Sequence, residues 1–395
     1  MSLLICYERQ LHYQSMQTTL LPSDKDYWKH IVTSNNQFGL NLLKTLAMAS
    51  PSSNVVISPT SIFLTACMLY NGAGGNTYSE FANTLQLPKP SEINPWNRQL
   101  LNYLVMSKPG HEVSIASALW FGQGVRCHED FVNNAVESYS ASLYGVDFRS
   151  PEAVEQINFW AENATNGKIA KIVESGDFSP DSLFAITNAI YFFAQWQTKF
   201  KEELTREEPF YLVGSGSKNV MMMNTTDSFK YKEEEHAQII KLPYKQSPYF
   251  MQIVLPKVGR SFGHCIEYIK NPNAAAITYN FPKVNLKLPR MEIAFDSNLN
   301  SAFGQLGMRD LFSQGCDLSL ITPNLLVSFI KHAAKLTVNE SGTEVAAATI
   351  AGMSIGASSG TSSTPIDIVV NRPFLMAIAD SGTGQVLFSG AILSP

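Results

Sequence analysis

The pattern of apolar and polar positions predicts helices in the first half of the chain. Phe38, Leu42, Leu43 and Leu46 recur at helical spacing within residues 23–50. Residues 54–77 read as a short buried strand, a Ser-Pro break and a mostly apolar helix that stops at a Gly-rich turn.

Residues 150–169 have the pattern of an amphipathic helix, with one polar and one apolar face. Ser150 is expected to cap it, Pro151 suits its first turn, and Gly167 can close it.

The second half of the chain reads mainly as strands. Residues 182–196 are long, apolar, β-branched and aromatic, which favours a buried central strand. Further strand candidates are the alternating segment 284–295, the long segment 325–342 and a hairpin in 372–393, with a short helix in 296–307 that ends at Gly307. Because helices and strands do not alternate regularly, the prediction is an α+β fold rather than a doubly wound parallel sheet.

Composition agrees with a globular protein that has a sizeable core. The 395 residues are 45% hydrophobic and 16% charged, with a net charge of −4. This charge gives no reason to expect nucleic acid or an anionic membrane as a partner, and no apolar run approaches the roughly 20 residues of a membrane span.

Cysteines and sequons leave the compartment open. The five cysteines are scattered and never in C-x-x-C spacing, which favours free thiols over a disulfide scaffold or a zinc site. Residues 1–10 make a poor secretory signal, whereas sequons at Asn163, Asn224 and Asn339 add a little weight for secretion. The expectation is an extracellular glycoprotein, with the cytoplasm as the alternative.

One motif raises the question of catalysis. Gly352–Gly356 fits the G-x-S-x-G pattern of a hydrolase nucleophile elbow around Ser354. An elbow needs a helix directly after its serine and a histidine later in the chain. A Ser/Gly/Thr run follows instead, and all seven histidines precede Ser354, so the pattern does not indicate an enzyme.

Other site chemistries also lack support. Residues 72–77 have glycines but no Gly-Lys-Ser/Thr, so a helix terminus is a better interpretation than a phosphate loop. The histidines are too dispersed for a metal cluster, and His332 on an apolar strand is best interpreted as a satisfied core histidine. No metal and no cofactor is expected.

Residues 343–350 suit two conformations. In a strand, Thr343, Val345, Ala347 and Thr349 lie on one face, which is small and uncharged, while Glu344 lies on the other. The flanks, Gly342 on one side and residues 357–364 on the other, suit an exposed loop. A segment of this kind can exist as a loop and also as a strand in a sheet.

Residues 339–349, NESGTEVAAAT, resemble the hinge of the serpins, the serine-protease-inhibitor family. The resemblance continues from about residue 27 to 393, through residues 54–77, 157–169, 187–196, 303–319, 329–344 and 371–392 in the family's order. It implies a serpin fold of three β-sheets and eight or nine helices, in a single domain 27–395 with a reactive centre loop at about 340–370 and an N-terminal extension 1–26.

The resemblance also implies roles for individual residues. Ser58, Ser61, Asn188 and His332 look like the hydrogen-bonded cluster where the central sheet opens, and Trp196 looks like the aromatic at the top of the opening. The hinge itself would be Glu340, Gly342, Thr343, Glu344, Val345, Ala346, Ala347, Ala348 and Thr349.

The mechanism implied is a stored strain that cleavage releases. A protease cuts the loop, the freed segment joins the central sheet as a strand, and the tethered acyl-protease is carried away and distorted. About fourteen residues at roughly 3.3 Å each span about 45 Å. The expected partner is therefore a serine protease in a covalent complex with a serpin monomer.

Family spacing places the cut between Gly356 and Ala357, with Ile355 and Met353 as alternatives. The loop is about six residues longer than usual, and the extra residues are assigned to the far side of the cut. No Lys or Arg lies between Glu344 and Pro365, which disfavours trypsin-like targets and favours elastase- or chymotrypsin-like ones. The alternative function is a non-inhibitory serpin that acts as a carrier or chaperone.

Overall fold

The computed structural model describes residues 25–105, 110–178, 182–214, 216–260, 262–269, 279–343 and 364–395, and side chains from residue 29 on. Within these residues the chain forms seven α-helices and three short 3-10 helices. The α-helices are α1 (Lys25–Ala49), α2 (Pro59–Tyr70), α3 (Gly75–Leu85), α4 (Pro90–Leu104), α5 (Glu129–Tyr139), α6 (Glu152–Ala164) and α7 (Asn300–Leu306). The 3-10 helices are η1 (Glu202–Leu204), η2 (Phe262–Ile269) and η3 (Asp310–Phe312).

The strands form three sheets, as predicted. The central sheet has the order β11–β12–β13–β4–β2–β3. Its strands are β2 (His111–Gly122), β3 (Ser142–Val146), β4 (Phe184–Gln195), β11 (Met291–Asn298), β12 (Phe329–Val338) and β13 (Gly342–Thr343).

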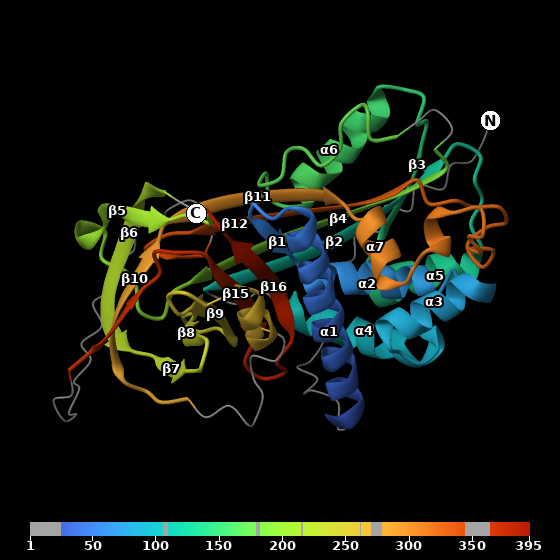
Figure 1. The fold of residues 1–395 in the computed structure, drawn as a ribbon. Coiled ribbons are helices and arrows are strands. Elements are labelled where there is room, and N and C mark those ends of the chain that lie inside the picture. Colours follow the sequence, from blue (N-terminus) through green and yellow to red (C-terminus); the bar gives the residue numbers. More distant parts are fainter. Residues whose placement is uncertain are drawn as a thin grey trace.

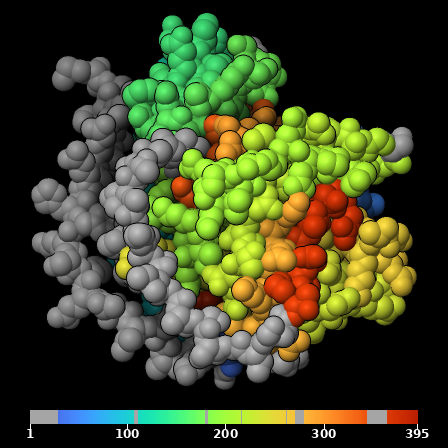
Figure 2. All heavy atoms as spheres, turned by 90° about the vertical axis from the view of Figure 1, so that its left-hand side faces the viewer, coloured from blue at the N-terminus to red at the C-terminus, as the bar shows by residue number. Residues whose placement is uncertain are grey.

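The other two sheets pack around one end of the central one (Figure 1). One, in the order β1–β16–β15–β9–β8–β7, has the bounds Val55–Ile57 (β1), Lys230–Glu233 (β7), Ala237–Pro243 (β8), Tyr249–Pro256 (β9), Phe374–Asp380 (β15) and Val386–Ile392 (β16). The other, in the order β14–β10–β6–β5, has the bounds Arg206–Tyr211 (β5), Ser217–Ser228 (β6), Lys283–Pro289 (β10) and Ile366–Val369 (β14). Figure 2 shows this smaller sheet from outside, with β14 in red beside β10 in orange.

The central sheet separates two hydrophobic layers. Helix α6 crosses one face, where Trp160 and Ile157 pack with Ala185 and Ala189 of β4. The alternate residues of β4, including Phe184 and Ile186, belong to the larger core on the opposite face, with α1 and α2. Because strand residues alternate between faces, β4 is buried on both sides and reads as one apolar run.

Most of the predicted elements are confirmed. The segment 182–196 contains β4, the segment 325–342 contains β12, and the alternating segment 284–295 forms β10 and β11, which meet at Arg290. Gly307 (φ +121°) and Gly167 (φ +79°) end α7 and α6 in left-handed backbone that glycine adopts most readily.

The predicted Ser150 cap is wrong. Pro151 already has helical backbone angles (φ −56°, ψ −29°), and the helix has no side-chain cap. The main-chain carbonyl of Ser150 instead accepts the N–H of Ala153 over 3.1 Å.

The described cysteines agree with the expectation of free thiols. Among the described residues, no disulfide involves Cys67, Cys127, Cys265 or Cys316. Within the described residues no group of His, Cys, Asp and Glu could hold a metal ion, and none of the described helices has both the length and the apolar composition that a membrane span requires.

Candidate functional site

The boundary between β4 and β12 is the place where the central sheet changes its pairing. Along the lower part, Phe329–Ala334 of β12 pair in parallel with Ala185–Ile190 of β4. At the upper end the two-residue strand β13 lies between them: Thr343 pairs with Val338 of β12 and Ala194 of β4. The hinge segment therefore already begins to separate β4 from β12.

Thr343 is held firmly in this position. It is 1% exposed, and its hydroxyl lies 2.6 Å from the hydroxyl of Tyr244. Tyr244 in turn stacks on the indole of Trp196, with ring centroids 4.6 Å apart and planes 9° from parallel. The first inserted side chain thus sits against a fully buried aromatic pair.

Trp196 also fixes the turn that leads into β13. Its indole Nε1–H donates to the carbonyl of Asn339 over 2.9 Å, and its main-chain N–H donates to the carbonyl of Ser341 over 3.0 Å. The amide oxygen of Asn339 accepts the N–H groups of Ser341 and Gly342. The turn 339–342 is therefore held by two hydrogen bonds from Trp196 and by two more to the side chain of Asn339, which belongs to the turn itself.

Gly342 allows β13 to lie this close to β4. A Cβ atom on this residue would lie 2.2 Å from the carbonyl oxygen of Ala194 and 2.8 Å from Cα of Gln195. Real Cβ atoms do not make such contacts with backbone, so only glycine fits the position without displacing β13.

Glu340 anchors the base of the hinge through its side chain. The carboxylate is buried, and its Oε1 accepts from Nη2 of Arg290 over 2.6 Å and from the hydroxyl of Thr205 over 2.7 Å. Burial by itself raises the pKa of Glu340, but the hydrogen bonds from Arg290 and Thr205 outweigh it, and the pKa lies below its usual value.

Lower on the same boundary, four of the predicted residues meet in one buried cluster. Ser58, Ser61, Asn188 and His332 are all 0–1% exposed. His332 on β12 and Asn188 on β4 are direct neighbours in the sheet, and Nδ1 of His332 lies 2.7 Å from Oδ1 of Asn188.

The hydrogen bonds assign the tautomer of His332. The main-chain N–H of Ser58 donates to Nε2 over 3.2 Å, so Nε2 carries the lone pair and Nδ1 carries the proton, which it donates to Asn188. Burial lowers the pKa of His332 to about 3, so the imidazole is neutral.

Two further residues complete the cluster and were missed by the sequence analysis. The amide NH₂ of Asn188 lies 2.6 Å from the hydroxyl of Ser61 and 3.1 Å from the hydroxyls of Thr65 and Ser117. Thr65 follows Ser61 by four residues and so lies on the same face of α2, a spacing that could have indicated it. The hydrogen-bond partners of the hinge, Arg290, Thr205 and Tyr244, have no comparable local signal.

The remaining predicted residues divide by position. Glu344, Val345, Ala346, Ala347, Ala348, Thr349, Met353, Ile355, Gly356 and Ala357 lie outside the described residues, and their roles stay predictions. Of the sequon residues, Asn163 is exposed on α6, whereas Asn224 and Asn339 are half-buried. The side chain of Asn224 donates to the carbonyl of Leu204 over 2.9 Å.

Comparison with known families identifies this architecture. Residues 33–395 match the model of the family described as "Serpin (serine protease inhibitor)". The chain belongs to the serpin family. The serpin family comprises non-enzymatic inhibitors and carriers, so Ser354 is not the nucleophile of a hydrolase and the chain is not an enzyme.

Individual serpins are similar along nearly the whole chain. The leukocyte elastase inhibitor of Sus scrofa is 30% identical over 93% of this chain and 100% of its own length. An uncharacterized serpin-like protein of Thermococcus kodakarensis is 32% identical over 93% of this chain and 86% of its own. The crystal structure of human glycosylated kallistatin superposes with a TM-score of 0.82 at 26% identity, over 93% of this chain and 98% of kallistatin.

Proposed function

We propose that this serpin inhibits a serine protease of elastase-like or chymotrypsin-like specificity by a suicide-substrate mechanism. The observation that carries the proposal is β13: the hinge enters the central sheet between two strands that pair directly below it. The entry point therefore exists before any cut, and further insertion only needs β4 and β12 to part along their shared edge.

The sequence that follows β13 supports insertion. Residues 344–351 are small or β-branched apart from Glu344, and none carries a bulky side chain on the face that begins with Thr343. Added as a strand, this segment gains main-chain hydrogen bonds on both edges. A cut loop thus reaches a lower free energy by insertion, which removes the tethered protease from its active geometry.

The proposed target specificity is supported by the sequence of the loop and by one similar serpin. No Lys or Arg lies between Glu344 and Pro365, and the residues near the predicted Gly356–Ala357 bond are small or apolar. The elastase inhibitor of Sus scrofa is among the similar serpins. We propose the extracellular space as the place of action, with glycans on the sequons.

The test is a covalent complex that survives SDS. Incubation with pancreatic elastase or chymotrypsin is expected to yield a band at the summed mass, whereas trypsin is not. Thr343→Arg places a charged side chain at a position that is 1% exposed between β12 and β4, so it should convert the inhibitor into a substrate. Ser362→Arg, beyond the predicted cut, is the matched control and should still form the complex.

Clean cleavage of the wild type without any complex across a broad protease panel contradicts the inhibitory function. The alternative, a carrier or chaperone, then takes its place.

A further inference from the structure

Lys331 is a buried cation on one of the two strands that must part. It is 8% exposed, and it lies on β12 directly opposite Thr187 of β4. Phe329 and Ala333, two residues before and after it, belong to the hydrophobic layer under α6. Because side chains alternate along a strand, Lys331 points to the α6 side of the sheet, opposite to His332. A buried charge on this face requires a partner of opposite charge.

Asp177 supplies that partner from the segment between α6 and β4. Its Oδ1 lies 2.7 Å from Nζ of Lys331, and the side chains of Lys331 and Asp177 are 10% and 19% exposed. Its Oδ2 accepts the main-chain N–H of Glu174 over 2.7 Å, so a local turn holds the carboxylate toward β12. Because the pair is largely shielded from water, salt screens it less than a surface pair.

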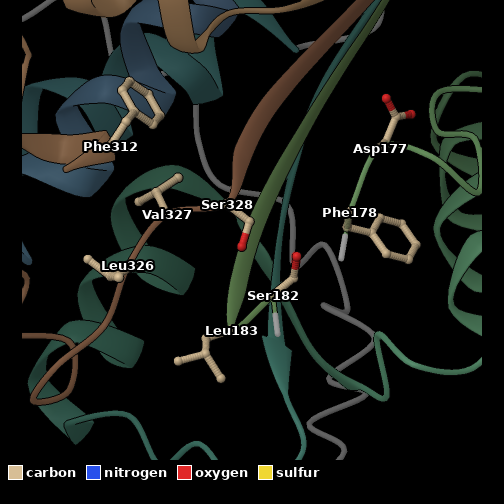
Figure 3. Close-up of a pocket in the computed structure, with 8 residues that line it drawn as sticks. All are labelled: Asp177, Phe178, Ser182, Leu183, Phe312, Leu326, Val327 and Ser328. Carbon is tan, nitrogen blue, oxygen red and sulfur yellow. The ribbon is translucent and has the colours of Figure 1, made fainter. Parts of the chain in front are cut away.

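The next residue adds an aromatic contact with the same strand. Phe178 stacks on Phe329 of β12, with ring centroids 6.0 Å apart and planes 18° from parallel. Figure 3 shows Asp177 and Phe178 beside the ribbons of β4 and β12, where both residues line a cavity of about 360 Å³. The open space next to them leaves room for this end of the segment to move once its contacts with β12 are lost.

Helix α6 and the segment after it form one packed unit. Oδ1 of Asn158 on α6 accepts the N–H groups of Ile172 and Val173 over 2.8 and 3.0 Å, and both of these side chains are buried in the layer under the helix. The helix itself packs on β4 through Trp160 and Ile157. The unit therefore spans the boundary, because its helix packs on β4 while its far end contacts β12.

Parting of the two strands therefore strains the contacts at the far end of this unit. The chain continues from Phe178 into β4, so the unit is linked to β4 by covalent bonds as well as by packing. When β4 moves away from β12, the ion pair between Asp177 and Lys331 has to break. On the opposite face, His332 and Asn188 join the same two strands. The boundary is thus held on both faces, by consecutive residues of β12.

We propose that the ion pair between Lys331 and Asp177 is a clasp whose release sets the rate at which β4 and β12 part, an inference that rests on the proposed insertion. Before the loop is cut, the clasp slows opening of the sheet and so keeps the loop outside it. After the cut, the clasp slows insertion. Its strength therefore sets a balance between the lifetime of the active form and the fraction of cut molecules that trap a protease.

The first experiment measures opening of the boundary without any protease. Lys331→Met removes the charge and keeps an apolar side chain of similar length at the buried position. Hydrogen exchange of the intact protein is followed by mass spectrometry in the segments 185–190 and 329–334. We expect exchange there to be faster by about tenfold or more, the factor that a hydrogen bond to a charged group is worth. Exchange in β16 should stay unchanged, whereas a general loss of stability would speed it too.

Glu174→Gln is the matched control. It breaks the ion pair of Glu174 with Lys171 on the same segment, whose side chains are 70% and 63% exposed, and exchange should stay as in the wild type. Asp177→Asn should speed exchange as Lys331→Met does, and it decides the test alone if Lys331→Met does not fold. The double variant should be no faster than the faster single variant, because both changes remove one contact. Wild-type exchange in the single variants, or additive effects in the double variant, would overturn the clasp.

A second experiment relates the clasp to inhibition. With pancreatic elastase, Lys331→Met should convert a larger share of the cut molecules into the SDS-stable complex than the wild type does. An equal or smaller share would show that release of the clasp does not limit insertion, and would overturn the proposal. If neither protein forms a complex while exchange differs as expected, the proposed function has failed and the clasp stands as the contact that holds the boundary closed.

Discussion

Nδ1–H of His332 donates to Oδ1 of Asn188 over 2.7 Å across the boundary between β12 and β4. The bond joins the two strands that must part if the hinge is to insert further. It is held on one side by the N–H of Ser58 and on the other by the hydroxyls around the Asn188 amide. The pairing of β12 with β4 at this point, which we call closure of the sheet, therefore depends on a neutral His332 in one tautomer.

Acidification should weaken this closure. The folded pKa of His332 is about 3, below the ordinary value of 6.5, so the unfolded chain binds a proton more readily than the folded one between these two pH values. Stability should fall as the pH drops from 6.5 toward 3, by at most about 1.4 kcal/mol per pH unit from this residue. Melting temperatures from pH 7 to 4 measure it.

The control for this prediction is His332→Gln, which cannot be protonated. Its melting temperature should be lower than the wild type's at pH 7 and should decline less steeply toward pH 4. If the melting temperatures of the two proteins decline equally with pH, protonation of His332 is not the cause of the acid sensitivity.

Removal of the Asn188 side chain should weaken the same contact between β4 and β12, this time from β4. Asn188→Ala leaves the proton on His332 and the hydroxyls of Ser61 and Ser117 without this partner, and each unsatisfied buried group costs about 1–3 kcal/mol. We expect a lower melting temperature of the intact protein and faster hydrogen exchange in Ala185–Ile190. Unchanged exchange in this segment would contradict the role given to the cluster.

Gly342→Ala tests the close approach of β13 to β4. The added Cβ meets the backbone of Ala194 and Gln195, so β13 should leave the sheet, and the hydroxyl contact between Thr343 and Tyr244 should be lost. Hydrogen exchange of Trp196, whose main-chain N–H donates to the carbonyl of Ser341 over 3.0 Å, reports the displacement. Gly304→Ala in α7, where a Cβ meets nothing within 4 Å, is the control and should be neutral or stabilising.

The Glu340–Arg290 pair should stabilise far more than a surface pair in the same sheet. Glu340→Ala leaves Arg290 and Thr205 without their acceptor, and hydrogen bonds to charged groups are worth about 1.5–3 kcal/mol. Glu292→Ala breaks the ion pair between the exposed Glu292 and the half-buried Lys335, for which about 0–1 kcal/mol is expected. Thermal unfolding of both variants compares them, and similar losses would argue against Glu340 as the anchor.

Local patterns predicted most of the fold. The apolar run of β4, the alternation of β10 and β11 and the left-handed glycines that end α6 and α7 each depend on neighbours along the chain. The hinge and the cluster residues were predicted from the resemblance to the serpins, because the motifs of that family are long.

The partners that hold these residues could not be read from the sequence. Arg290 meets Glu340 from 50 residues away, Tyr244 meets Thr343 from 99 and Ser117 meets Asn188 from 71. Only the packed sheet brings such pairs together. Likewise, the register of β13 is defined by its pairing with β12 and β4, which no sequence pattern reveals.

The most direct test compares the melting temperature of the intact protein with that of protein cut once between Glu344 and Pro365, with mass spectrometry to locate the cut. Insertion adds a strand through the middle of the central sheet. The cut protein should therefore melt higher by well beyond the roughly 2–4 °C that 1 kcal/mol is worth in a domain of 150–250 residues. A cut protein that melts at or below the temperature of the intact one would contradict the account.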